Sequence, residues 1–343
     1  MKRRVIFLLY MLLCINTNAQ NYRNAKAYIN DFGKNELFVK EALMEYSRSI
    51  IDYNPEYRTE DELERIYKKL EEINANLVKN DIGFNGDVGL RDEFMELNNK
   101  TIALLKNKTL KLNDYGFQSD LDYGNILKNF SNKEIEIAKY YSDIIEYEKY
   151  KKDFGLKYNL IVRNYSGKNV FEYDAYQNLI FYKLNVLDEK LMKLYKMKDL
   201  EKLDECLVYM NTIIKESYYK TNQMKDDFAD RSLNDINVEL IAFFQNQNDN
   251  LRNLYFQYYS LSDALEKQKN VISNSQDAMQ IETYNELVKK YNLAKNIYFD
   301  TLFDNQVAKK QLIERWYQTN SLFLKNNIIF EDIFEKYVTE KKD

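Results

Sequence analysis

The stretch from Lys168 to Asp343 contains no glycine and no proline. These two residues cost the interior of a helix more free energy than any others, so their absence leaves a helix few places to break. The apolar residues recur at steps of three and four, which is the spacing of one helix face rather than the alternation of a strand. This half of the chain is therefore predicted to be helical.

Five apolar series divide this half into five predicted helical segments. The series begin at Ile180, Leu200, Ile236, Ile281 and Leu312. Gln247 occupies one position of the third series, and a buried amide is costly without a hydrogen bond, so this residue is expected to have a partner. Consecutive amphipathic segments of this kind are typical of an all-α bundle.

The first half shows the same kind of pattern. One helix is expected from Tyr22 to Asn54, because the residue before a proline is disfavoured in helical angles. A second is expected to begin at Thr59, which has capping-box spacing, and a third at Leu90. The turn between them, 81–89, holds three of the eight glycines of the chain.

Two later segments of the first half are less regular. Residues Thr109 to Phe130 lose the helical spacing and are expected to form a long connection. Ser131 and Glu134 have capping-box spacing and are expected to open a fourth helix. The segment from Leu156 to Tyr165 alternates like a short strand, and an irregular linker fits it equally well.

The two halves correspond in pattern at an offset of roughly 148 residues, as tandem copies would. Residues 28–49 lie over 176–197, and the acid-rich turn 81–92 lies over 226–235. We therefore predict an all-α protein of two tandem antiparallel helical bundles that arose by internal duplication. The predicted divisions are a signal peptide at 1–19, a first bundle at 20–155, a linker at 156–169 and a second bundle at 170–343.

The N-terminus is typical of a secretory signal peptide. Basic residues at 2–4 precede an apolar run from Val5 to Ile15, and small residues, Thr17 and Ala19, occupy the −3 and −1 positions of a cleavage site. The expected locations are therefore the periplasm, the cell surface or the medium. The rest of the chain has no apolar run long enough to span a membrane.

Composition limits the chemistry available to the chain. The net charge is −4 and the lysines are scattered among glutamates, so nucleic-acid binding is disfavoured. The chain has no histidine, which excludes Ser-His and Cys-His nucleophiles and histidine-ligated metals. Cys206 is the only cysteine after the signal, and its place between leucines predicts a buried structural thiol. We expect no enzyme activity and no cofactor, with a carboxylate-dependent glycosidase as the remaining catalytic alternative.

The acid-rich turns invite comparison with calcium loops. Asp81, Asn85 and Asp87 loosely follow such a loop, but a helix cap explains them better, with Asp87 capping the third helix and Asp92 in its first turn. The corresponding acids of the second half are Asp226, Asp227, Asp230 and Asp235, with Ser232 as the expected cap. No metal site is predicted in either turn.

The first of these turns also carries a resemblance. Its residues from Phe84 to Asp92 read Phe-Asn-Gly-Asp-Val-Gly-Leu-Arg-Asp. This turn resembles the inter-helix turn of exported, helix-rich bacterial surface proteins whose activity is uncharacterised. The resemblance covers the N-terminal part of the mature chain, and the second half lacks the Gly-Asp pair. It implies a secreted four-helix unit and brings no catalytic residue with it.

Tyrosine is unusually common, at 30 residues. Most of these rings are expected to pack in the bundles, with hydroxyls that reach water or a partner. A binding face is the alternative, because tyrosine is favoured at interfaces. The aromatic residues that could face a ligand are Tyr218, Tyr219, Tyr255, Tyr258, Tyr259 and Trp316. Of these, Trp316 lies at a core position of its series.

These observations favour an exported, non-catalytic helical-bundle protein that acts through surface or protein interaction, as a structural or adhesive component. The alternative is a module that binds a small ligand or a glycan in a tyrosine-lined groove.

Overall fold

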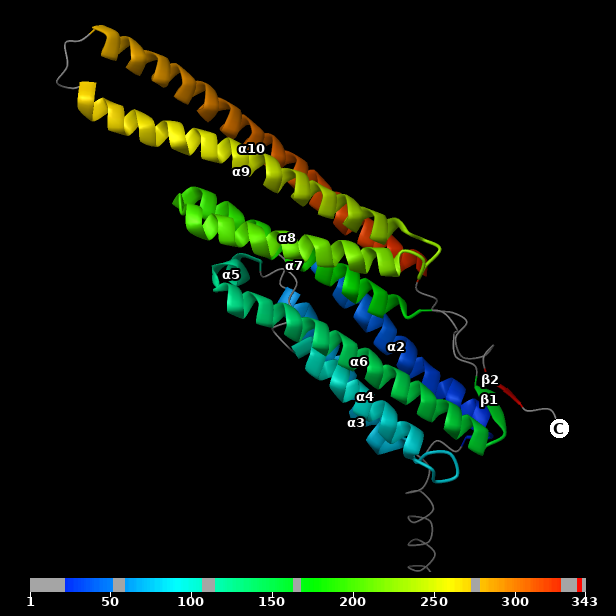
Figure 1. Ribbon diagram of the computed structural model, residues 1–343. Coiled ribbons are helices and arrows are strands. Elements are labelled where there is room, and N and C mark those ends of the chain that lie inside the picture. Colours follow the sequence, from blue (N-terminus) through cyan, green and yellow to red (C-terminus); the bar gives the residue numbers. More distant parts are fainter. Residues whose placement is uncertain are drawn as a thin grey trace, which may run out of the picture. The chain divides into compact units, whose positions relative to one another are not determined.

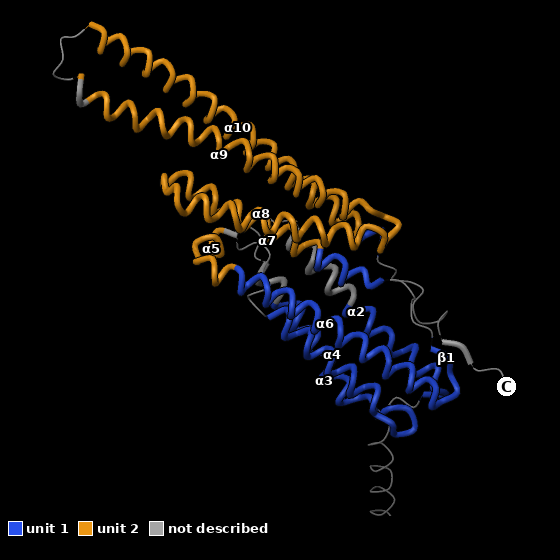
Figure 2. The backbone as a smooth tube through the Cα atoms, viewed as in Figure 1, with its two compact units in different colours: residues 1–113, 127–176, 324–343 blue, residues 114–126, 177–323 orange. Residues whose placement is uncertain are grey.

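The computed structural model describes residues 22–51, 59–106, 115–162, 168–272, 278–327 and 338–340. Almost all of these residues are helical, which confirms the predicted all-α class (Figure 1). The chain forms two compact units, and both are discontinuous in sequence (Figure 2). Unit 1 comprises residues 1–113, 127–176 and 324–343, and unit 2 comprises 114–126 and 177–323. The predicted signal peptide, 1–19, lies outside the described residues.

Unit 1 is built from helices around an aromatic core. Its helices are α2 (Ala25–Ile51), α3 (Thr59–Asn80), α4 (Gly89–Lys106) and most of α6 (Tyr123–Lys157). Phe32 and Phe94 meet edge to face with ring centroids 5.0 Å apart, and Tyr28 packs beside Phe32 at 5.8 Å. A short antiparallel pair of strands, β1 (Leu160–Val162) and β2 (Val338–Glu340), completes the described part of the unit. The strand-like alternation of the sequence is confirmed at β1.

The turn between α3 and α4 needs its glycines. Gly83 has a φ of 76°, and a Cβ there would lie 2.1 Å from the carbonyl oxygen of Asp87. Asn85 and Gly86 also have positive φ, at 54° and 77°. Glycine adopts these angles without strain, and asparagine tolerates them better than most residues, so the turn can reverse the chain within a few residues.

The predicted connection from Thr109 to Phe130 is wrong where the structure describes it. Helix α5 (Tyr115–Asp120) lies within it, and α6 begins at Tyr123, so Ser131 is inside a helix and caps nothing. The start of α6 is capped by Asp122, whose Oδ1 accepts from the Asn125 N–H at 2.9 Å. The glycines that suggested a loop, Gly116 and Gly124, are the second residues of α5 and α6. Glycine destabilises a helix less in its first turn, where the N–H groups have no helical partners, than in its interior.

Unit 2 is built from four long helices and α5. The long helices are α7 (Val170–Met197), which begins in the residues of unit 1, α8 (Leu200–Met224), α9 (Ser232–Ile272) and α10 (Ala278–Asn327). The fourth and fifth predicted segments are one continuous helix, α10, because nothing between them interrupts it. Ile281, at the start of the fourth series, is exposed. Helices α9 and α10 run side by side as a long hairpin (Figure 1).

The core of unit 2 follows the predicted apolar series. The buried members are Ile180, Leu184, Leu187, Leu191 and Leu194 on α7, Leu203, Leu207, Met210 and Ile214 on α8, and Ile236, Leu240 and Leu251 on α9. Duplication and a tandem arrangement of bundles stay predictions, as do the bundle limits at 155 and 170.

Candidate interaction surface

Helix α10 packs into unit 2 through one face. Tyr298, Trp316 and Phe323 lie on this face and are buried. The Trp316 ring stacks on Phe181 with centroids 3.9 Å apart, and its Nε1 donates to Asn237 Oδ1 at 2.8 Å. Trp316 is therefore a core residue, as its position in the sequence indicated, and it is not available as a ligand-facing aromatic.

The opposite face of α10 carries large apolar side chains that are exposed. Leu293, Phe303 and Val307 are 63%, 65% and 42% exposed. They belong to a series of exposed positions at alternating steps of four and three, which follows one line along a helix. We call this series the outer stripe. Its members are Lys289, Leu293, Asn296, Asp300, Phe303, Val307, Lys310 and Glu314.

Two further apolar residues widen the outer stripe. Ile297 and Phe299 lie beside it and are 44% and 46% exposed. Single exposed apolar residues are normal on a protein surface, whereas several of them close together are a feature of interaction sites. On α10 these exposed side chains form two short rows, Leu293 with Ile297 and Phe299 with Phe303, on either side of Asn296 and Asp300, and Val307 continues the outer stripe beyond Phe303.

Buried polar contacts fix the rotation of α10 about its own axis. Lys309 forms an ion pair with Asp188 of α7, which is 0% exposed. The Asp188 carboxylate also accepts from Gln247 Nε2 of α9 at 2.7 Å. Further along, Asn320 Nδ2 donates to Asn178 Oδ1 at 2.7 Å. Since breaking a buried ion pair is strongly unfavourable, α10 cannot turn to bury its outer stripe within unit 2.

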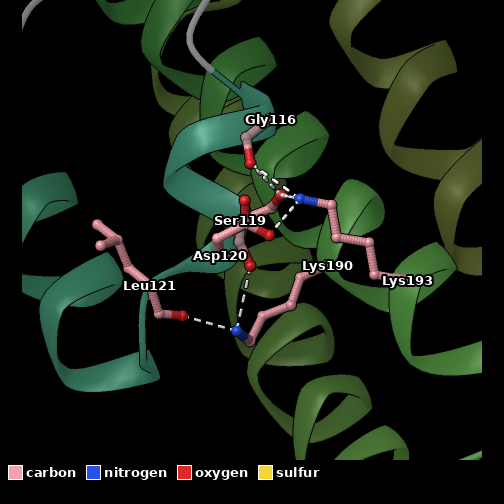
Figure 3. A network of polar contacts seen from close by, with 6 residues as sticks. All are labelled: Gly116, Ser119, Asp120, Leu121, Lys190 and Lys193. Carbon is pink, nitrogen blue, oxygen red and sulfur yellow. Dashed lines mark hydrogen bonds and ion pairs between the residues drawn. The ribbon is translucent and has the colours of Figure 1, made fainter. Parts of the chain in front are cut away.

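The first helix of unit 2, α5, is held by two lysines of α7 (Figure 3). Lys190 Nζ donates to the carbonyl oxygens of Ser119 and Leu121 at 3.2 and 2.6 Å. Lys193 Nζ donates to the Gly116 carbonyl oxygen at 2.9 Å and to Ser119 Oγ at 2.8 Å. The last carbonyls of a helix lack helical partners and carry partial negative charge, so ammonium groups suit them. Sequence reasoning missed this contact because a six-residue helix shows no period.

Three of the predicted ligand-facing tyrosines gather at one place in unit 2. Tyr255, Tyr258 and Tyr259 lie on α9, and Tyr255 packs against Tyr195 of α7 at 5.0 Å between ring centroids. Tyr258 stacks on Tyr298 of α10 at 5.6 Å with an interplanar angle of 4°. Tyr255 is buried, whereas Tyr258 and Tyr259 are half-buried. We call these five residues the tyrosine cluster.

The remaining two predicted aromatics, Tyr218 and Tyr219, lie apart from this group in sequence. Both are on α8 and are more than half exposed. Tyr219 OH accepts from Gln223 Nε2 at 2.8 Å, one turn further along the same helix.

Several polar groups near the tyrosine cluster are buried without a hydrogen-bond partner among the described residues. They are the hydroxyls of Tyr195 and Tyr255 and both side-chain amide atoms of Asn248, which lies two turns before Tyr255 on α9. Burial raises the pKa of Tyr255 to about 12 and also raises the pKa of Tyr195. Both hydroxyls therefore stay protonated at neutral pH and can donate as well as accept.

In the acid-rich turn of unit 1, the carboxylates of Asp81 and Asp87 accept hydrogen bonds from neighbouring groups of the protein. Asp81 accepts from the Gly83 N–H at 2.7 Å and from Tyr28 OH at 3.2 Å. Asp87 accepts from the Gly89 N–H at 3.1 Å, so it serves the start of α4 as predicted, and it forms an ion pair with Lys157. Burial raises the pKa of Asp87, but the hydrogen bonds from Lys157, Gly89 and Tyr158 lower it more, and the net pKa is below its usual range.

The corresponding turn of unit 2 is capped by a different residue from the one predicted. Ser232 is the first residue of α9, and its N–H donates to Asp230 Oδ1 at 3.0 Å. Within the described residues of both units, no group of three or more acidic or cysteine side chains is placed to hold a metal ion.

Cys206 is buried in unit 2, as predicted. Its Sγ lies 3.8 Å from the Leu187 carbonyl oxygen, to which the thiol donates. Burial raises the pKa of this thiol to about 11. Since the thiolate is the reactive form, Cys206 is suited to packing rather than to chemistry.

None of the helices in the described ranges combines the length and the apolar character that crossing a membrane requires. Comparison of the chain with protein-family models, with curated proteins and with solved structures gives no match.

Proposed function

We propose that this protein is exported and that it works by binding another protein through the outer stripe of α10. The observation that carries the proposal is the exposure of Leu293, Phe303 and Val307 on a helix whose rotation is fixed by buried polar contacts. Covering these side chains would remove apolar surface from water, which is favourable by about 25 cal/mol per Å². The proposal needs no catalytic residue and no cofactor.

The spacing of the outer stripe favours a helical partner. Alternating steps of four and three are the spacing of a seam between two helices, in which each side chain enters a gap on the facing helix. Phe303 and Val307 form the apolar centre of the outer stripe, and two charged residues, Asp300 and Lys310, stand on either side of it. Such charges set which partner binds and in which direction, more than they set the affinity.

Export is supported by the basic residues and apolar run at the N-terminus. Within this proposal the protein acts in the periplasm, on the cell surface or in the medium. Its stability there comes from packing, since only one cysteine remains after the predicted signal and no disulfide can form within the chain.

The test is affinity capture with the mature chain from the culture medium or an envelope extract of the organism that makes it. Phe303→Asp places a charge at the centre of the outer stripe and should abolish capture. Val208→Asp is a matched control, because Val208 is equally exposed at 65% but lies on α8. Equal capture by wild type and both variants would contradict the proposal.

A second candidate function is the binding of a small polar ligand beside the tyrosine cluster. The observation that favours it is the set of buried polar groups without partners, on Tyr195, Tyr255 and Asn248. A ligand that hydrogen-bonds to them would remove the cost of burying them unpaired. A ligand screen by thermal shift tests it, and a true ligand should lose its effect in Tyr255→Phe.

A further inference from the structure

We infer that the partner of the outer stripe is a second copy of this chain, with the two α10 helices packed antiparallel. This inference rests on the proposed function, since it names the partner of the same surface. It depends on the order of charged and apolar residues along the stripe.

The apolar centre of the outer stripe is self-complementary when the two helices run in opposite directions. Placing the two-fold axis midway between Phe303 and Val307 sets Phe303 of each copy against Val307 of the other. Both side chains are exposed in a single chain. A two-fold contact of this kind uses the same patch on both copies and closes the assembly at two.

The same alignment pairs opposite charges. Asp300 lies one step before Phe303, and Lys310 lies one step after Val307, so each Asp300 faces Lys310 of the second copy. The pairing occurs twice, once on each side of the axis. One step further out, the Asn296 amide faces the Glu314 carboxylate, to which it can donate.

Other alignments of two α10 helices are less favourable. A parallel pair in register sets Asp300 against Asp300 and Lys310 against Lys310, and like charges in contact are repulsive. An antiparallel pair shifted by 14 residues, about four turns, brings Leu293 to Phe303 but sets the charged Lys289 against the apolar Val307. The charges therefore select both the direction and the register.

Asp300 and Lys310 are available for this contact. Both are exposed, and neither has an ion-pair partner within the described part of its own chain. By contrast, the neighbouring Lys309 is committed to Asp188 inside unit 2. Adjacent lysines on α10 thus differ in what they contact, because successive residues point about 100° apart around a helix.

The first test is sedimentation of the mature chain over a range of concentrations. Wild type is expected to form a dimer that dissociates on dilution. Phe303→Asp should weaken the dimer by roughly a hundredfold or more, since it places two carboxylates in the apolar centre. Val208→Asp should leave the dimer unchanged. A wild-type chain that stays monomeric, or a dimer that resists Phe303→Asp, would overturn the inference.

The second test is charge reversal, which distinguishes this alignment from any other. Asp300→Lys alone and Lys310→Asp alone should each weaken the dimer roughly tenfold, because each creates two like-charge contacts. The double variant Asp300→Lys with Lys310→Asp restores opposite charges and should recover most of the wild-type affinity. Failure of the double variant to recover would overturn the antiparallel alignment.

Failure of this inference can be told apart from failure of the proposed function. Suppose that the chain is monomeric but captures a different protein, and that the Phe303→Asp variant no longer captures it. The inference that the partner is a second copy is then wrong, and the proposed binding surface stands. If Phe303→Asp changes neither the dimer nor the capture, both are wrong.

Discussion

Asp188 and Gln247 are hydrogen-bonded in the core of unit 2, with Gln247 Nε2 donating to Asp188 Oδ1 at 2.7 Å. Both side chains are buried, and the carboxylate also forms the ion pair with Lys309. Through these contacts, one residue from each of α7, α9 and α10 takes part in a single polar cluster. It confirms that Gln247, the polar residue in an apolar series, has a partner, and it fixes which face of α10 points outward.

Removing one member of this contact should destabilise unit 2 strongly. Asp188→Ala leaves the buried Gln247 amide without its acceptor and leaves the half-buried Lys309 ammonium only the Glu189 carboxylate at 3.5 Å. The expected cost is about 3 kcal/mol, the lower end for a broken buried ion pair. The free energy of unfolding by chemical denaturation, followed by Trp316 fluorescence, measures this loss. The double variant Asp188→Leu with Lys309→Met should lose much less, since it buries no unpaired charge. If the double variant lost as much stability as the single variants Asp188→Leu and Lys309→Met added together, the ion pair would be contradicted.

The Tyr255 hydroxyl should be dispensable for stability at neutral pH. It is buried with no partner among the described residues, so Tyr255→Phe is expected to leave the stability unchanged or to raise it by about 1 kcal/mol. Tyr140→Phe is the matched control, because Tyr140 OH is buried against Thr101 Oγ1 at 2.7 Å, and its loss should cost about 1 kcal/mol. A large loss in Tyr255→Phe would instead point to a bound ligand.

The same tyrosine should make the protein sensitive to alkali. The pKa of Tyr255 is raised from 10.0 to about 12 in the folded state, so the unfolded chain releases its proton first. Stability is therefore full below the unfolded pKa and falls as pH rises toward the folded pKa. The fall in the free energy of unfolding should be shallower in Tyr255→Phe. Identical pH profiles for the two proteins would contradict the shift.

The Cys206 thiol should be unreactive in the folded protein. Its burial and raised pKa predict that the mature chain reacts with a thiol reagent at about pH 8 only on unfolding. The measurement is the labelling rate in buffer and again in strong denaturant. Rapid labelling without denaturant would show that Cys206 is accessible.

Calcium should not change the stability of either unit. The carboxylates of Asp81 and Asp87 already accept hydrogen bonds from protein groups, and the acids of the second turn include Asp230, which serves the start of α9. Thermal unfolding with calcium and with a chelator is expected to give the same midpoint. A large rise with calcium would mean that a turn binds the ion, by linkage of binding to folding.

The long helices could be predicted from the sequence because periodicity and the absence of glycine and proline act over many residues. The burial of Trp316 and Cys206 follows from the same pattern, whereas the start of α3 at Thr59 was predicted from its capping-box spacing. Helix α5 could not be predicted, since it is held by Lys190 and Lys193 from a distant part of the chain. Tertiary contacts, rather than local preference, decide such short elements.

The outer stripe was missed for a different reason. Sequence reasoning assigns every apolar series to a core, and α10 has two such series on opposite faces. Only the structure shows that Tyr298 and Trp316 are buried while Leu293 and Phe303 are exposed. Three members of the tyrosine cluster, Tyr255, Tyr258 and Tyr259, could be grouped from the sequence because they share one helix. The other two, Tyr195 and Tyr298, could not, because they come from other helices.

The most direct test of the central claim is whether the outer stripe is covered where the protein acts. Thiols introduced by Phe303→Cys and by Val208→Cys would be labelled with a maleimide in the native medium or envelope, and again on the purified chain at high dilution. We predict that labelling of Phe303→Cys is strongly slowed in the native setting and that labelling of Val208→Cys is unchanged. Equal labelling of both variants in both settings would contradict the claim that this protein acts through α10.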